Sequence, residues 1–323
     1  SYGVTSSTRS KESAITQYML EIDPKHISVC ETDTFESSVA PQDAFVLKSE
    51  PADSMSDKQF LRDAFIEQGI SATALNNYLD CPWKYFYRNL VRVPEKPTSS
   101  SLYGNALHNA LRLFREMSAS ARTYQSLPQL LEYLKTSIDS QGFTPASHAD
   151  AQKKGVRALT DWHARNAAGF EYNAICEKKF EVYAPLSNES IRQVLLRGLI
   201  DVIEFSSDGS VHVIDYKTGK HRSRNELEGG TKNATGDYVR QLNFYCILLE
   251  LSQMQAPTRL SIEFIEPDAK GKTVVHTFAF DADAVKELRE TIERVAGEIY
   301  SLSFWNSRCD DKECDYCALR ELS

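Results

Sequence analysis

Two aspartates and a lysine near the middle of the chain are the residues best suited to chemistry. Asp201 closes the motif Arg-Gly-Leu-Ile-Asp, and Asp215 and Lys217 belong to the motif Asp-Tyr-Lys-Thr-Gly. Two carboxylates can share a divalent metal, the metal can generate hydroxide from water, and a lysine can stabilise the charge that develops. The trio suits hydrolysis of a phosphodiester, although Asp-x-Lys alone is a weak motif and each residue alone also fits an exposed or capping role.

A β-hairpin must position these three residues. Residues 194–205 and 211–217 are rich in Val, Ile and Leu, and the Ser-Ser-Asp-Gly-Ser sequence between them has the composition of a turn. With the turn centred on its aspartate, Asp201 lies directly opposite Asp215, with Cβ atoms roughly 5 Å apart. Strand periodicity places Lys217 on the same face as Asp215. The prediction depends on register, because a slip of one residue would separate the two carboxylates.

Two predicted helices carry further polar motifs. Residues 103–117 have the apolar spacing of an amphipathic helix, and His108 lies beside its apolar stripe. A histidine in that position is usually a satisfied core residue, but Gly104, one turn earlier, leaves room above the imidazole and favours a ligand. In a later helix Gln241 and Tyr245 share one face, because they are four residues apart.

Basic residues gather after the second aspartate, and the members of this cluster are Lys217, Lys220, Arg222 and Arg224. Such a cluster can contact phosphates, or it can be a solvated loop. The net charge of the whole chain is −8, whereas free-standing DNA-binding proteins are usually basic. The cluster therefore predicts a local contact with nucleic acid rather than a generally basic surface.

The composition is that of a globular protein. The chain has 323 residues, of which 41% are hydrophobic and 25% charged, and it contains no apolar run long enough to span a membrane. No secretory signal pattern opens the chain. Seven cysteines, an odd number in a long chain, argue against a disulfide framework and for a reducing, cytoplasmic compartment.

The order of predicted elements indicates a mixed α/β core with a central β-sheet flanked by helices. Residues 1–68 are interpreted as a disordered tail and connector, and 69–323 as the main domain, with a helical insertion at about 120–170. Ser71 is the expected N-cap of the first helix of this domain. That helix is predicted to continue past Cys81 and the proline that follows it.

Three cysteines at the C-terminal end, Cys309, Cys314 and Cys317, fall within nine residues and indicate a metal or cluster site. Cys81 is the best candidate for a fourth ligand, because it too lies where a helix meets a loop. Four thiolates alone do not separate zinc from iron–sulfur, and unrelated free thiols are the alternative. The remaining cysteines, in apolar or strand-like surroundings, are expected to be inert.

Taken together, these motifs resemble the RecB-like branch of the PD-(D/E)XK nucleases, as found at the C-terminus of UvrD-like helicase–nucleases and in AddB. The similarity covers roughly residues 70–320. It includes the opening motif Ser-Ala-Thr…Tyr-Leu-Asp-Cys-Pro-Trp-Lys-Tyr-Phe-Tyr, the Gly-x-x-x-His helix, a strand glutamate, Gly-x-x-Asp, Asp-Tyr-Lys-Thr-Gly and Gln-x-x-x-Tyr. The resemblance implies the restriction-endonuclease-like core of that superfamily.

The resemblance also implies roles for individual residues. Asp201 and Asp215 match the two acids that bind Mg²⁺ or Mn²⁺, and Lys217 matches the catalytic lysine. The helix histidine, His108, matches a residue that assists metal binding, and the strand glutamate, Glu177, is expected to support the site. The residues expected to contact DNA are Gln241, Tyr245, Lys220, Arg222 and Arg224.

Members of this family that carry iron and sulfur hold a [4Fe–4S] cluster that joins the two ends of the domain. The resemblance implies the same for Cys81, Cys309, Cys314 and Cys317. The chain departs from the usual C-terminal spacing, because the third position of that pattern falls on Ser323, so Cys309 would have to replace it. Zinc, or no metal, is the alternative.

Residues 11–22 resemble a segment that closes the second motor domain of such helicases. The sequence contains no Walker A motif, so no ATPase activity is expected of it. The predicted function is therefore a metal-dependent deoxyribonuclease, expected to be an exonuclease, that acts with a helicase on single-stranded or unwound DNA ends in repair or recombination. A catalytically weak DNA-end-binding scaffold and a stand-alone restriction-type endonuclease are the alternatives. The expected location is cytoplasmic and nucleoid-associated, with no membrane partner.

Overall fold

The computed structural model describes residues 5–6, 9–12, 57–232, 234–267 and 273–321. Most of the predicted tail and connector, residues 1–68, lies outside this part of the chain. The described elements, in chain order, are β1 (Thr5–Ser6), β2 (Arg9–Glu12), α3 (Lys58–Gln68), β3 (Ile70–Ser71), α4 (Ala72–Asp80), α5 (Pro82–Tyr85), the π-helical turn η3 (Phe86–Leu90), α6 (Ser99–Ala121), α7 (Leu127–Asp139), α8 (Pro145–Asn166), β4 (Ala174–Pro185), β5 (Gln193–Phe205), β6 (Val211–Lys217), α9 (Arg224–Leu227), α10 (Asp237–Leu251), β7 (Arg259–Phe264), β8 (Val275–Ala279), α11 (Ala282–Ser301), the 3₁₀ turn η4 (Ser303–Asn306) and α12 (Asp315–Glu321).

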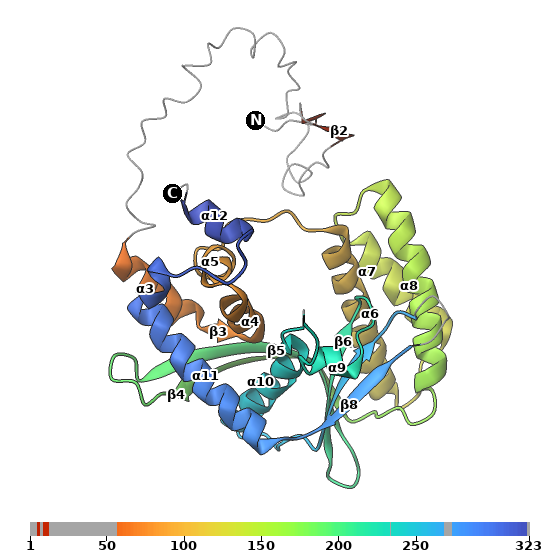
Figure 1. Cartoon of the computed structure of the whole chain (residues 1–323). Helices are drawn as coiled ribbons and strands as arrows, with labels where there is room; N and C mark the ends of the chain where they lie inside the picture. The colour runs from red at the N-terminus through yellow and green to blue at the C-terminus, as the bar shows by residue number, and fades with distance from the viewer. Residues whose placement is uncertain (1–4, 7–8, 13–56, 233, 268–272, 322–323) are drawn as a thin grey trace, which may run out of the picture.

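A six-stranded mixed sheet forms the centre of the domain (Figure 1). Its strand order is β3-β5-β6-β7-β8, with β4 paired to β5 outside this path. β5 and β6 form the predicted antiparallel hairpin, and the crossover through α10 brings β7 parallel to β6. The short β3 runs parallel to the first half of β5. The predicted fold class, a mixed α/β core with a central mixed sheet flanked by helices, is therefore confirmed.

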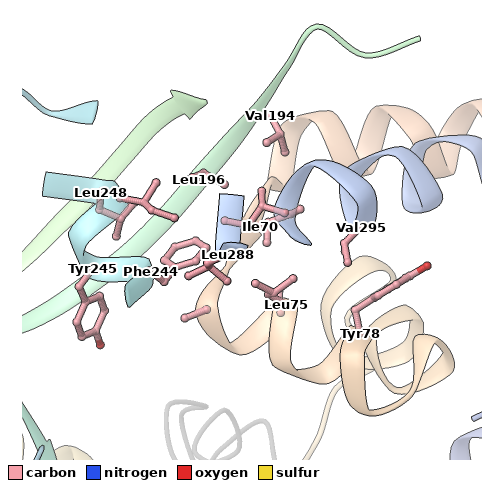
Figure 2. Close-up of a cluster of buried hydrophobic side chains, with 14 of the residues drawn as sticks. Ile70, Leu75, Tyr78, Val194, Leu196, Phe244, Tyr245, Leu248, Leu288 and Val295 are labelled. Atoms are coloured by element: carbon pink, nitrogen blue, oxygen red, sulfur yellow. The ribbon is translucent and has the colours of Figure 1, made fainter. Parts of the chain in front are cut away.

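Helices cover both faces of the sheet. The long α6 packs with α7 and α8, which correspond to the predicted helical insertion, and their core contains the fully buried Trp162. The main core lies on the other face, where residues such as Leu196 of β5, Phe244 of α10 and Leu288 of α11 meet (Figure 2). None of the helices in the described part of the chain is long and apolar enough to cross a membrane.

The helix that starts the main domain begins as predicted but is shorter. Ser71 caps α4, with its hydroxyl accepting the backbone N–H of Ala74 at 3.1 Å. The helix ends at Cys81, whose extended backbone (φ −158°, ψ 121°) separates α4 from α5. Pro82 causes the break, because proline disfavours a helical conformation in the residue before it and suits the first position of a new helix. The predicted continuous helix is therefore wrong, and Cys81 lies at a junction between two helices.

α3, which precedes residue 69, packs into the main core. Its Leu61 and Phe65 are fully buried there. Arg62 on the same helix donates from Nε to the backbone carbonyl of Tyr300 in α11 at 3.0 Å. Part of the region interpreted as connector thus contributes apolar surface to the packed domain.

A glycine allows α10 to lie directly against β5. A Cβ atom at Gly198 would lie 2.3 Å from Cδ1 of Leu248, and Leu248 is fully buried in the main core. The helix α10 carries Gln241 and Tyr245, and β5 carries Asp201. Gly198 therefore lets α10 lie close to β5, which sets the distance between the motifs that these two elements carry.

The close approach at Gly198 leaves little room for a side chain. Gly198→Ala should lower the free energy of unfolding by about 1–3 kcal/mol, the usual effect of overpacking a filled core. Urea denaturation followed by circular dichroism measures it. Gly142→Ala is the control, because nothing lies within 4 Å of a Cβ there. Leu248→Ala should also lower the free energy of unfolding by less in the Gly198→Ala background than in the wild type. An unchanged midpoint for Gly198→Ala would contradict the close approach.

Candidate active site and cysteine group

The two aspartates come together as the hairpin predicts. β5 and β6 pair with the predicted register, and their ladder ends with Val202 opposite Ile214, one position before Asp201 and Asp215. At this point the carboxylate of Asp201 accepts the backbone N–H of Tyr216 at 2.7 Å. Both aspartates are buried, with 7% and 2% of their surface exposed. Burial and the neighbouring charge of Asp215 raise the pKa of Asp201 above its ordinary value.

Beside Asp201, the side chains of β4 and β5 no longer alternate regularly between the two faces of the sheet. In β5, Ile200 belongs to the main core and Val202 to the core under α6, although strict alternation would put both on one face. Opposite this point in β4, Glu177 has a φ of 49°, in the left-handed region. A residue with a side chain adopts that region at a cost of roughly 1 kcal/mol or more. The strain thus falls on a residue of the candidate site.

α6 brings His108 to these acids. Its Nδ1 lies 3.2 Å from Oδ1 of Asp201 and 3.7 Å from Oε1 of Glu177. Burial lowers the pKa of His108, but the two carboxylates raise it by more, so that the pKa is about 10. Gly104 and His108 line the same pocket, which agrees with the room beside the imidazole expected from the sequence. A Cβ atom at Gly104 would lie 3.1 Å from Oγ1 of Thr218, so the glycine also lets α6 approach the loop after β6.

Three side chains form a group that can hold a metal ion. One ligand atom from each of His108, Glu177 and Asp201 lies within 4.8 Å of the others. The predicted set contained Asp215 in place of Glu177, and the carboxylate of Asp215 instead lies 2.7 Å from Nζ of Lys217. Carboxylates suit Mg²⁺ or Mn²⁺, and imidazole suits transition metals. The donor set therefore fits a divalent cation.

Lys217 is held at the end of β6 by its neighbours. Its Nζ pairs with Oδ2 of Asp215 and donates to Oε1 of Gln241 at 2.8 Å. The ring centre of Tyr238 lies 4.7 Å from the same nitrogen. Burial lowers the pKa of Lys217, but the negative charges of Asp215 and Asp201 raise it more. The amine is therefore protonated and can stabilise developing negative charge.

Gln241 and Tyr245 continue this chain of hydrogen bonds. The hydroxyl of Tyr245 donates to Oδ1 of Asp215 at 3.0 Å and accepts from Nε2 of Gln241 at 2.6 Å. Burial and nearby carboxylates raise the pKa of Tyr245 well above its ordinary value, so the hydroxyl remains a donor. Only 3% of Tyr245 is exposed. Its contacts orient Asp215, and the role in holding DNA that the sequence predicts for this pair stays a prediction.

The predicted basic cluster divides into two parts. Arg222 lies over the ring of Tyr238, 4.3 Å from its centre, on the side of the site. Lys220 is exposed in the same loop. Arg224 instead lies over Phe278 of β8, 4.3 Å from the ring centre. Of the two arginines, Arg222 therefore shares the ring of Tyr238 with Lys217, and Arg224 contacts a different strand.

Tyr238 is a site residue that the sequence analysis did not single out. Its ring contacts the two cations Lys217 and Arg222. It lies three residues before Gln241 and therefore on the same face of α10. Helical spacing from the Gln-x-x-x-Tyr motif is the signal that could have identified it.

Arg115, two turns after His108 in α6, supports the site from the side of the sheet that α6 covers. It is buried, and its guanidinium donates to the hydroxyl of Tyr216 at 2.8 Å and to Glu204 at 2.9 Å. Tyr216 is the residue whose backbone N–H binds Asp201. No local pattern marks this arginine, because its partners lie 101 and 89 residues away in the sequence.

Four cysteines form a second group of candidate metal ligands, and its members are the predicted Cys81, Cys309, Cys314 and Cys317. Their sulfurs lie within 4.8 Å of one another, and Cys81 and Cys317 are buried. The group joins residues 236 positions apart in the sequence. Near it, the indole of Trp83 donates to the backbone carbonyl of Ser307 at 3.0 Å. The beginning and the end of the domain therefore meet at this group.

The chain belongs to the PD-(D/E)XK nuclease superfamily, because the sequence profile of that superfamily matches residues 69–322. A comparison with curated proteins gave no match. Among solved structures, the crystal structure of SSO0001 is 17% identical, with a TM-score of 0.33, and the match covers 82% of this chain and 94% of that one. A candidate exonuclease from Eubacterium rectale is 10% identical, with a TM-score of 0.45, and the match covers 80% and 90%. The family assignment rests on the sequence profile.

The contacts of Tyr245 generate a second prediction. Tyr245→Phe removes a hydrogen bond to a buried carboxylate, worth about 1.5–3 kcal/mol, and should lower the rate of nucleic-acid cleavage about tenfold or more. Metal affinity, measured by calorimetry, should change little, because Tyr245 contacts Asp215 and not the three-residue donor group. Tyr183→Phe, at an exposed position of β4, is the control. An unchanged rate, or lost metal binding, would contradict the positioning role.

Proposed function

We propose that the chain is a metal-dependent deoxyribonuclease whose active site consists of His108, Glu177, Asp201, Asp215 and Lys217. One observation carries the proposal. A three-residue donor group lies at the end of the β5–β6 hairpin, beside an aspartate paired with a lysine. Membership of a nuclease superfamily supports the same conclusion.

Each side chain of the site has a role in this proposal. A divalent cation such as Mg²⁺ or Mn²⁺, held by His108, Glu177 and Asp201, would polarise the scissile phosphate and lower the pKa of water. Lys217 stabilises the negative charge that increases on the phosphate during attack. Asp215 holds the lysine in place before substrate binds. If the amine of Lys217 moved from Asp215 to the phosphate, one carboxylate oxygen of Asp215 would become free to bind the metal. This agrees with the role of metal ligand expected of Asp215.

A pocket beside the donor group, lined mostly by polar residues, offers space for the substrate. Its volume is about 470 Å³, and His108 and Glu177 lie in its wall. The other polar side chains that line it are Ser100, Ser101, Asn105, Asn109, Arg112 and Thr218. Hydroxyl, amide and guanidinium groups are the usual partners of DNA phosphates. We infer that the DNA backbone passes through this pocket on its way to His108.

The wider context of the activity is also a proposal. The motifs that resemble RecB-like nucleases support a nuclease that works with helicase motor domains. Its substrate would be single-stranded or unwound DNA ends, and its action that of an exonuclease in repair or recombination. The motifs after residue 69 carry this resemblance more strongly than the short helicase-like segment at 11–22.

Two other functions remain as alternatives. A DNA-end-binding scaffold would not need an intact catalytic set, so the close approach of His108, Glu177 and Asp201 favours an enzyme. A stand-alone restriction-type endonuclease would share the same acids. The Gln-x-x-x-Tyr helix, which holds Asp215 and Lys217 here, counts against that alternative because it belongs to the RecB-like motif set.

For the cysteine group we propose a structural metal site that holds the first and last parts of the domain together. The resemblance implies a [4Fe–4S] cluster for this site, and zinc is the alternative that the residue types allow.

The catalytic assignment is tested by two substitutions. Asp215→Asn and Lys217→Met should each lower cleavage of labelled DNA by about 100-fold or more, as expected when a group that stabilises transition-state charge is lost. Both variants should still be folded at the assay temperature, which circular dichroism checks. A chelator should abolish wild-type cleavage, and added Mg²⁺ or Mn²⁺ should restore it.

Asp208→Asn makes the same chemical change as Asp215→Asn in the exposed turn of the same hairpin, so it should cleave like the wild type. Wild-type rates for Asp215→Asn would place the chemistry elsewhere. A wild-type protein that binds DNA and metal but never cleaves would favour the scaffold alternative.

The division of the basic cluster predicts unequal effects on DNA binding. Lys220→Ala should weaken binding of single-stranded DNA and reduce the salt dependence of log affinity by about 0.7, the value for one phosphate contact. Arg224→Ala should have a smaller effect, because Arg224 is paired with Glu228 at 2.8 Å and lies over Phe278. Fluorescence anisotropy at several salt concentrations, in the Asp215→Asn background, measures both. Equal effects would contradict the division.

A further inference from the structure

The four cysteine sulfurs lie very close together. Sγ of Cys81 lies 3.7 Å from Sγ of Cys317 and 3.7 Å from Sγ of Cys314. Sγ of Cys309 lies 3.7 Å from that of Cys317. All four sulfurs lie within 4.8 Å of one another. Three of the six separations are thus 3.7 Å and the other three are no longer than 4.8 Å, so the four sulfurs can surround one common centre.

A single tetrahedral ion fits these distances. Zinc binds thiolate sulfur at about 2.3 Å, which gives edges of about 3.8 Å for its tetrahedron of four sulfurs. The observed separations of 3.7 Å agree with that edge. We propose that Cys81, Cys309, Cys314 and Cys317 form a mononuclear zinc site in place of an iron–sulfur cluster.

The [4Fe–4S] cluster implied by the family resemblance does not fit the same four sulfurs. In such a cluster each thiolate binds a different iron at a separate corner of a cube, and four sulfides complete the cube. The thiolate sulfurs must then lie on the outside of an eight-atom core. Sulfurs that are all within 4.8 Å of one another leave no room for that core between them.

The spacing of the ligands agrees with zinc. Four residues separate Cys309 from Cys314, and two residues separate Cys314 from Cys317. Both intervals fall in the range of about two to four residues that is typical of paired zinc ligands. The departure from the family pattern at Ser323 then has a physical reason, because Cys309 supplies the remaining tail ligand at a spacing suited to zinc.

Backbone amides complete the surroundings of the thiolates. The N–H groups of Trp83 and Lys84 hydrogen-bond the sulfur of Cys81, and that of Cys317 hydrogen-bonds the sulfur of Cys314. Four thiolates around a divalent ion carry a net negative charge, which such donors offset. Donors of this kind also fix the orientation of the ligands. With four protein ligands the site is closed, as is typical of structural zinc.

Metal analysis of the whole chain tests the proposal. The protein is produced in medium containing both iron and zinc and is purified without oxygen. We expect about one zinc per chain, negligible iron and acid-labile sulfide, and a colourless solution. A brown protein with about four irons and four sulfides per chain would overturn the proposal. Iron in any other amount in place of zinc, or no bound metal, would overturn it as well.

Cobalt(II) provides a second measurement that does not depend on nuclease activity. Added to the metal-free wild-type chain, Co²⁺ should give the intense visible absorption of a tetrahedral thiolate complex. Cys309→Ser should weaken and shift this absorption, because one sulfur is replaced by oxygen. Cys176→Ser, which changes a half-buried cysteine outside the group, should leave it unchanged. A Cys309→Ser spectrum identical to that of the wild type would overturn the four-thiolate site.

Discussion

The register of β5 against β6 is the constraint on which the geometry of the candidate active site depends. It brings Asp201 and Asp215 to the same level of neighbouring strands, where the N–H of Tyr216 binds the first and the hydroxyl of Tyr245 binds the second. A slip of one residue would turn the side chain of Tyr216 into the site and Asp215 toward the core under α6. The helices that complete the site can reach the acids only in the observed register, and Gly198 allows α10 to come close enough.

The negative charge of the candidate site favours the binding of a cation. Glu177, Asp201 and Asp215 bring three carboxylates together, and Lys217 offsets one of them. Burial opposes ionisation of Asp201 and raises its pKa, so the remaining negative charge is destabilising without a partner. A protonated His108 offsets one charge in the free protein. A divalent cation would balance two, while the imidazole binds as a neutral ligand. The carboxylates repel one another in the absence of a cation, and a doubly charged ion would balance their remaining charge.

Local patterns were sufficient to predict much of the fold and of the site. Strand periodicity and the turn fixed the pairing of Asp201 with Asp215, because register depends on few and nearby residues. The face change at Glu177 and the support from Arg115 were not predictable, since both arise from packing between distant segments. The break at Cys81 follows from the next residue, proline, and could have been predicted. The cysteine types and spacing indicated a metal site, but distances between sulfurs from opposite ends of the domain exist only in the folded chain.

The left-handed backbone of Glu177 lowers stability at a position where the side chain belongs to the candidate metal-binding group. Glycine adopts a φ of 49° without steric cost, so a glycine at this position would relieve strain in β4. It would also delete one of the carboxylates beside His108. A redesign guided by thermal stability alone would therefore favour the loss of a residue of the candidate metal-binding group. The position needs to be exempted from consensus or stability-guided engineering of this domain.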